Sequence, residues 1–230
     1  MKHFFTTRQP EGLIEDWPGK YAIFSWLEFA ITVPNPIYVV TTEKPGGVPN
    51  ANLQSWGMPL NEGGKNHFLM AILRRQHTYE NILRTGEWCV NYLPRSLYAL
   101  AERTIDREDG QKALLRDEIR DAGLDVYESR VVSAPGIAQS KIILECRRVW
   151  NRPLVEGSAW ELFCGAVVGV HADADALTAD PERRIANLEL MYNVRGTVNP
   201  LDGSFYGPNT LGVLDTVEKV TEETADNTGL

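Results

Sequence analysis

Two adjacent arginines stand just before a short predicted helix, and together they could bind a phosphate group. Arg74 and Arg75 end an apolar run, and Thr78 is placed to cap a helix over Tyr79 to Thr85 that stops at Gly86. A helix start carries free N–H groups and the positive end of the helix dipole, and arginine presents a planar fork to phosphate oxygens. This stretch therefore predicts an anion site. The alternative is an exposed basic strand end beside an ordinary capped helix.

Polar side chains gather at the end of an earlier predicted strand and offer both hydrogen-bond donors and acceptors. Asn52, Gln54 and Ser55 supply two amides and a hydroxyl, which could serve the polar edge of a heteroaromatic ring. Trp56 and Gly57 follow directly, and the indole could stack beside such a ring. The alternatives are an edge strand that faces water and a tryptophan that fills the core or an interface.

A hairpin is expected to position these polar residues. Pro45, Gly46 and Gly47 supply the residues that a tight turn requires. We therefore predict two paired strands, over Ile37 to Glu43 and over Val48 to Gln54. The polar side chains then lie where the second strand leaves the sheet.

Two long strands are predicted farther along the chain. The run from Lys141 to Trp150 alternates with the period of a half-buried strand. The run from Leu162 to Val170 is apolar and contains Gly165 and Gly169, which is typical of a strand buried on both sides and bent at a barrel corner. The first strand is expected to place Ile142, Leu144, Cys146 and Trp150 on its apolar face, Lys141, Glu145 and Arg147 on its polar face, and Arg148 near a rim.

Helical patterns interrupt and follow the strands. Residues 96–123 show helical spacing and indicate a structural cover rather than a second domain. Pro181 is expected to open a helix that contains Arg183, Ile185, Leu188 and Met191. The stretch 196–212, rich in Gly, Asn and Pro, predicts an irregular loop. The acidic stretch 216–230 predicts a mobile tail.

Composition excludes several classes of function. The chain has 230 residues, of which 43% are hydrophobic, and this is enough for one substantial core. A net charge of -8 and a pI near 5.1 argue against general binding to nucleic acid or to an anionic membrane. Charged and proline residues interrupt the apolar stretch 21–40, so we expect no membrane span. Met1 to Phe5 lead directly into polar residues rather than an apolar signal segment, so we expect a cytoplasmic protein.

The cysteines and histidines do not predict a metal site. Cys89, Cys146 and Cys164 lie in separate apolar runs, and an odd number without paired spacing favours buried reduced thiols. The four histidines show no spacing typical of metal ligands. We assign no metal.

Several segments, in order along the chain, resemble the flavin reductase-like family of FMN-binding split barrels, which includes NAD(P)H:flavin oxidoreductases and flavoredoxins. The resemblance runs from Pro36 to His171. One segment departs from the family pattern, because residues 104–112 replace a segment of the Ser-Gly-Arg-Asp type. A contact usually made there is expected to be absent or replaced. The matching segments are 36–42, 49–57, 74–82, 86–91, 134–140, 143–146 and 165–171.

The resemblance implies a mainly β fold with helical inserts, an FMN-binding split β-barrel. It implies FMN as the cofactor, with Ser55, Trp56 and Gly57 against the flavin ring. Asn52 and Gln54 join them as candidate partners of the ring edge. The domain expectation is an N-terminal extension over 1–35, which could cover part of the cofactor or of a partner subunit, then a barrel domain over 36–215, and a tail over 216–230.

The same resemblance places other residues around the cofactor. Arg74, Arg75 and Thr78 fall on the phosphate-binding segment of the family. Asn91 falls at the end of a strand that flanks the site. Tyr206 resembles a late aromatic residue of flavoredoxin-like members, which approaches the cofactor.

Three classes of function follow from this resemblance. The leading hypothesis is an FMN-dependent oxidoreductase that transfers a hydride from NAD(P)H to flavin, with a monooxygenase or another redox protein as partner. No catalytic side chain is assigned, because the flavin would perform the redox step. The second hypothesis is a flavoredoxin-type electron carrier, and the third is an interaction protein that has lost flavin. We also expect a homodimer, because aromatic residues of the N-terminal region offer apolar surface.

Overall fold

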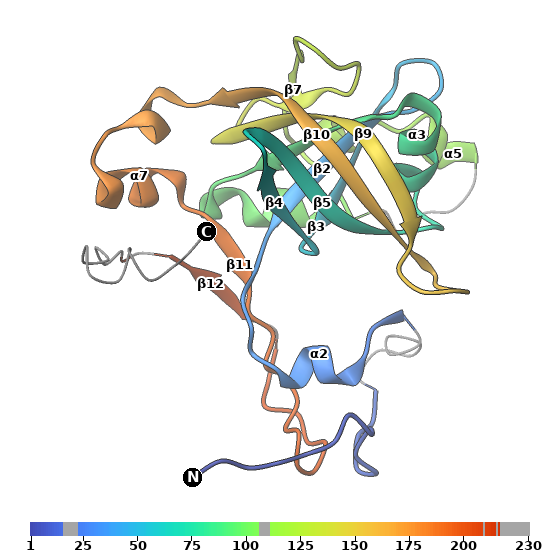
Figure 1. Ribbon diagram of the computed structural model, residues 1–230, viewed down its shortest axis with the longest axis vertical. Helices are drawn as coiled ribbons and strands as arrows, with labels where there is room; N and C mark the ends of the chain where they lie inside the picture. Colours follow the sequence, from blue (N-terminus) through green and yellow to red (C-terminus); the bar gives the residue numbers. More distant parts are fainter. Residues whose placement is uncertain (16–22, 106–110, 209, 215, 217–230) are drawn as a thin grey trace.

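The centre of the molecule is a seven-stranded antiparallel sheet that curls into a barrel-like layer (Figure 1). This computed structural model describes residues 1–15, 23–105, 111–208, 210–214 and 216. The strand order is β3-β2-β6-β9-β10-β5-β4. The predicted class, mainly β with helical inserts, is confirmed. The strands are β2 (Tyr38–Glu43), β3 (Pro49–Gln54), β4 (Gly57–Glu62), β5 (Lys65–Leu73), β6 (Glu87–Tyr92), β9 (Ile142–Pro153) and β10 (Trp160–Ala172).

The predicted hairpin is confirmed as β2 and β3. Lys44 N–H donates to the carbonyl of Val48 at 2.8 Å, and Gly47 N–H donates to the carbonyl of Lys44 at 3.1 Å. Gly46 and Gly47 have φ of +83° and +79°, a backbone conformation that favours glycine. The two strands pair from Tyr38 opposite Gln54 to Glu43 opposite Pro49, so the turn sets the register of the whole hairpin.

The Lys44 side chain ties this turn to the helical insert. The side chain is fully buried, and its ammonium group donates to the carbonyls of Ala113 at 2.6 Å and Arg116 at 2.8 Å. It also forms an ion pair with Glu118, which is itself buried. A buried lysine is stable only when its charge and donors are satisfied, so this contact fixes the insert on the hairpin.

Strand β9 confirms the predicted alternation only as far as a bulge. Cys146 faces the inner core, as predicted. Gly165 pairs with Arg148 while Cys164 pairs with Trp150, so Val149 is an extra residue on β9. One inserted residue exchanges the two faces of a strand. The predicted inner position of Trp150 is therefore wrong, and its side chain is 38% exposed.

Strand β10 bends where its glycines were noted, but it is not buried along its whole length. Register shifts occur next to Gly165 and Gly169. At Gly165 an added Cβ would lie 2.3 Å from the Trp88 ring, so only glycine fits there. Val170 is exposed, which corrects the prediction that both faces are covered. Glu145, predicted on the polar face, is fully buried.

Short helices cover the outer face of β2 and β3, as predicted for residues 96–123. Together with Val39, Ala51 and Leu53 their apolar residues form one core cluster, distinct from the inner cluster that contains Tyr38 and Val40. Residues 106–110, in the segment that departs from the family pattern, lie outside the described part of the chain. The elements of this region are η1 (Arg95–Leu97), α4 (Tyr98–Glu102), α5 (Gln111–Leu114), α6 (Glu118–Asp121), β7 (Val126–Tyr127) and β8 (Gly136–Ile137).

The C-terminal part returns to the N-terminal extension. Pro181 opens a helix, α7, as predicted, but the helix ends at Leu188 and Glu189 takes a left-handed φ of 47°. Met191, predicted in this helix, instead begins a strand. The sequence predicted an irregular loop over 196–212, but the strand β12 begins inside this range, at Leu211. The elements are α2 (Trp26–Ala30), β1 (Asn35–Pro36), η2 (Ala174–Leu177), α7 (Pro181–Leu188), β11 (Met191–Asn193) and β12 (Leu211–Val213), with sheet order β1-β11-β12.

The N-terminal extension packs against a C-terminal segment in a separate lobe, which lies below the barrel in Figure 1. Trp26, Phe29 and Val198 share a small core cluster. The side chains of Trp26 and Phe29 are thus buried within the chain. Trp17, Tyr21 and residues 217–230 of the predicted tail lie outside the described residues. Among the helices that the structure describes, none combines the length and the apolar character needed to cross a membrane.

Candidate functional site

One face of β3 carries a row of polar side chains that meets the start of helix α3 (His77–Thr85). Asn50, Asn52 and Gln54 alternate along the strand and therefore share a face. Asn50 donates to the Thr78 hydroxyl at 3.1 Å, and Gln54 donates to the Gln76 side-chain carbonyl at 3.3 Å. Asn52 lies between these pairs, and its buried amide forms no hydrogen bond with the described residues.

The start of α3 differs from the prediction by two residues. The helix begins at His77, with Gln76 at the capping position and no side-chain hydrogen bond to the cap. Thr78 is therefore not the cap; its side chain is 1% exposed and receives its hydrogen bond from Asn50. The predicted end at Gly86 is confirmed by its φ of 72° and its N–H bond to Ile82. A helix start without a side-chain cap leaves first-turn N–H groups for another acceptor.

The two arginines have different surroundings. Arg74 donates from Nε at 3.0 Å and from Nη2 at 2.7 Å to one oxygen of Glu161. The other oxygen of Glu161 accepts a hydrogen bond of 2.6 Å from Asn151. Arg75 is exposed and forms no ion pair or side-chain hydrogen bond with the residues that the structure describes. Sequence reasoning missed Glu161, because only the β5–β10 pairing brings it beside Arg74.

Trp56 joins the barrel to the N-terminal lobe. Its indole N–H donates to Glu28 at 2.8 Å, and its ring centroid lies 4.3 Å from that of Trp160. Glu28 also pairs with Arg195 at 2.7 Å. Trp56 is therefore held in place by packing and by one hydrogen bond.

Ser55 and Gly57 flank Trp56 at the crossing from β3 to β4. Ser55 is partly exposed beside the β3 polar row. At Gly57 an added Cβ would lie 2.2 Å from the Tyr38 hydroxyl and 2.9 Å from the Leu69 carbonyl. A glycine is required there by this close approach.

The structure does not bring Asn91 or Tyr206 to this place. Asn91 is paired with Val39, so it lies on the outer face of the sheet, opposite Asn52. Its amide donates to the Val39 carbonyl and to the Thr41 hydroxyl, and its oxygen accepts the Ile137 N–H at 2.9 Å. Tyr206 is 67% exposed in the N-terminal lobe, where its N–H donates to Thr197.

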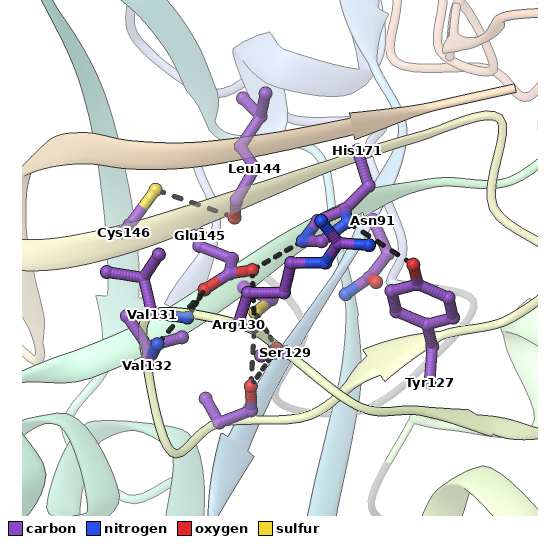
Figure 2. Close-up of polar contacts among 12 residues, drawn as sticks. Asn91, Tyr127, Ser129, Arg130, Val131, Val132, Leu144, Glu145, Cys146 and His171 are labelled. Atoms are coloured by element: carbon purple, nitrogen blue, oxygen red, sulfur yellow. Dashed lines mark hydrogen bonds and ion pairs between the residues drawn. The ribbon is translucent and has the colours of Figure 1, made fainter.

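Glu145 forms a second polar cluster on the outer face of the sheet (Figure 2). Its buried carboxylate accepts N–H groups from Arg130, Val131 and Val132 at 2.7 to 3.0 Å and a contact from His171. The other ring nitrogen of His171 lies 3.3 Å from the Tyr127 hydroxyl. Burial alone would raise the pKa of Glu145, but these hydrogen bonds outweigh it and hold the pKa below 4.5.

Glu145→Gln should make the stability less dependent on acidic pH. A carboxyl group whose folded pKa is depressed adds stability above its unfolded value and loses it as the pH falls through the folded value. The wild-type free energy of unfolding should therefore fall below pH 4.5, the ordinary value, more steeply than that of the variant. At neutral pH the variant should be less stable by about 1–3 kcal/mol. Urea unfolding across this range measures both, and equal slopes would contradict the assignment.

The cysteines are buried, as predicted. Burial raises the pKa of the Cys89 thiol to about 12, so this thiol stays protonated and unreactive. The described residues contain no group of three or more His, Cys, Asp or Glu side chains suited to a metal ion.

The strand order and the helix α3 define a split barrel of the kind found in flavin reductases. A family model for the flavin reductase like domain matches residues 31–199. The chain therefore belongs to the flavin reductase-like family. The match extends beyond the segments recognised from sequence alone, and membership supports FMN as the cofactor.

Solved structures with the same fold include proteins with different roles. Nitrilotriacetate monooxygenase component B from Bacillus cereus gives a TM-score of 0.71 at 21% identity, covering 90% of this chain and 98% of that one. The flavoredoxin of Desulfovibrio vulgaris gives 0.67 at 15%, covering 85% and 94%. An FMN-binding domain of a flavin reductases-like enzyme from Shewanella baltica gives 0.61 at 14%, covering 81% and 90%. No curated protein sequence matches the chain.

The side chains at the start of α3 fit a flavin phosphate. Arg75 has no ion-pair or hydrogen-bond partner for its side chain among the described residues, Arg74 keeps one guanidinium nitrogen outside its pair with Glu161, and the helix start lacks a side-chain cap. This donor set is cationic and suits an anion. The Asn52 amide, which bonds to none of the described residues, offers both a donor and an acceptor to a neighbouring polar ring.

Proposed function

We propose that this chain is an FMN-dependent NAD(P)H:flavin oxidoreductase of the flavin reductase-like family. The observation that carries the proposal is the meeting of the β3 polar row with the cationic, uncapped start of α3. Arg75 and the first turn of α3 bind the phosphate, and Arg74 lies beside them in its pair with Glu161. Asn52, Gln54 and Ser55 face the polar edge of the ring.

The protein residues hold and shield the cofactor. FMN held there would supply the redox chemistry of hydride transfer from NAD(P)H. Gly57 lets the β3–β4 crossing approach the sheet closely. The packed rings of Trp56 and Trp160 exclude water from this crossing. Thr78 acts indirectly, because its buried hydroxyl anchors the helix start to Asn50.

A flavoredoxin-type electron carrier is the second candidate. Its support is the shared fold with a flavoredoxin, and it requires the same phosphate and ring contacts. The two functions differ in whether NAD(P)H reduces the bound flavin. An interaction protein without flavin is the third candidate. Arg75 and Asn52 weigh against it, because their side chains have no polar partner within the part of the chain that the structure describes.

The visible spectrum of the purified protein separates these candidates. We expect FMN to bind and its yellow absorbance to bleach rapidly when NADH or NADPH is added. Yellow protein that stays oxidised with both nucleotides, yet accepts electrons from dithionite, would support the carrier. Protein that takes up no added FMN would refute both flavin functions.

We expect the protein to be a cytoplasmic homodimer that passes reduced flavin or electrons to a monooxygenase or another redox protein. Apolar side chains are exposed on the β9–β10 hairpin, at Val149, Leu154 and Val155, and they offer surface for a second copy. Light scattering of the FMN-loaded protein should give twice the chain mass. A monomer mass with FMN bound would contradict the dimer.

A further inference from the structure

The Arg74–Glu161 pair sets a negative charge directly behind one of the two arginines next to the start of α3. The Arg74 side chain is 40% exposed, whereas that of Glu161 is 4% exposed. The carboxylate therefore lies on the protein side and the guanidinium on the solvent side. Asn151 fixes the second oxygen of Glu161, so the carboxylate is held rigidly in this place.

The pairing with Glu161 occupies most of the hydrogen-bond donors and offsets the charge that Arg74 could offer to a phosphate. Two of its three nitrogens, Nε and Nη2, already donate to Glu161. The charges of the two side chains cancel, and a phosphate approaching the exposed edge meets a nearly neutral pair. The fixed carboxylate close behind that edge thus offsets the attraction of the guanidinium for a dianion.

We infer that Glu161 limits the affinity of the site for FMN, so that the chain holds FMN as an exchangeable flavin rather than as a permanently bound group. This inference rests on the proposed function, because it assumes that the phosphate binds at the start of α3. Arg75 and the helix start then provide the net attraction. Glu161 acts only on flavins that carry a phosphate.

Glu161→Gln tests the inference with little change of shape, because glutamine can still accept from Arg74 and contact Asn151. We expect the Kd for FMN to fall about three- to tenfold at low ionic strength, since one repulsive charge is removed. The Kd for riboflavin should stay the same. The dissociation rate of FMN, measured by stopped-flow fluorescence, should slow by a similar factor.

Glu87→Gln is the matched control. Glu87 also binds an arginine through Nε and Nη2, at 3.2 and 3.0 Å from Arg147, so the substitution removes the same charge from a similar pair. Glu87 lies opposite Arg147 on β6 and β9, away from the β3 polar row. FMN affinity should be unchanged in this variant.

A double variant covers the case in which Glu161→Gln folds poorly. Arg74→Met with Glu161→Gln removes the whole neutral pair, and the inference predicts an FMN affinity within about threefold of wild type. Weaker FMN binding in Glu161→Gln would show that Glu161 orients Arg74 and would overturn the inference. Equal changes for FMN and riboflavin would also overturn it. If the wild type binds neither flavin, the proposed function itself fails.

Discussion

Replacing Lys44 with methionine should lower the free energy of unfolding by about 3–5 kcal/mol. The substitution removes a buried ammonium group from the Glu118 carboxylate and from the carbonyls of Ala113 and Arg116. Methionine fills a similar volume but can donate to none of these oxygens. The cost is that of leaving a buried charge without its ion-pair partner and two carbonyls without their donor.

Chemical denaturation measures this loss, with Lys65→Met as the control. Lys65 is exposed at the start of β5, so that variant should stay near wild-type stability. A second variant, Lys44→Met with Glu118→Gln, should recover part of the loss, because the remaining side chain is neutral. A Lys44→Met variant that unfolds at the wild-type denaturant concentration would show that the buried pair contributes little.

Arg75→Ala should weaken FMN binding by about 1.5–3 kcal/mol, or roughly tenfold to a hundredfold, and should leave riboflavin binding unchanged. Of the two arginines, Arg75 is the one whose guanidinium has no partner among the residues that the structure describes, so it can bind a phosphate. Riboflavin lacks the phosphate, so the ratio of the two affinities isolates this contact. Arg74 is less suited to the same test, because its removal would leave Glu161 buried and unpaired.

Fluorescence titration of both flavins gives that ratio. Arg103→Ala is a suitable control, since Arg103 is exposed at the end of α4, which packs on the opposite face of the hairpin. Equal losses of FMN and riboflavin in the Arg75→Ala variant would assign Arg75 to folding rather than to phosphate binding.

Local sequence signals predicted the elements that local chemistry controls. The turn at Gly46 and Gly47 determined the β2–β3 register, and Pro181 opened α7. The alternation of β9 could be predicted only up to Val149. The bulge there depends on the partner strand rather than on the sequence of β9 itself. The end of α7 was missed because Glu189 adopts a left-handed conformation that glutamate rarely takes.

The candidate site was predicted by residue type better than by residue role. Asn52 and Gln54 lie on β3 beside the start of α3, where Thr78 accepts a hydrogen bond from Asn50. Thr78 was misassigned as a cap because the helix begins at His77, one residue before it. Its hydroxyl instead accepts a hydrogen bond from Asn50, 28 positions earlier. Asn91 was placed by resemblance near the site, but strand pairing turns its side chain to the other face.

The pairing of β5 with β10 has a consequence for the order in which the chain acquires its structure. The β2–β3, β4–β5 and β9–β10 hairpins join neighbouring segments, whereas Arg74 and Glu161 are 87 positions apart. Contacts between distant segments must overcome a larger loss of chain entropy before they gain anything. The β3 polar row and the start of α3 lie within residues 50–78 and can form from neighbouring segments, whereas the Glu161 carboxylate reaches Arg74 only when β5 and β10 pair. The site for the phosphate can therefore form before the charge that opposes it arrives.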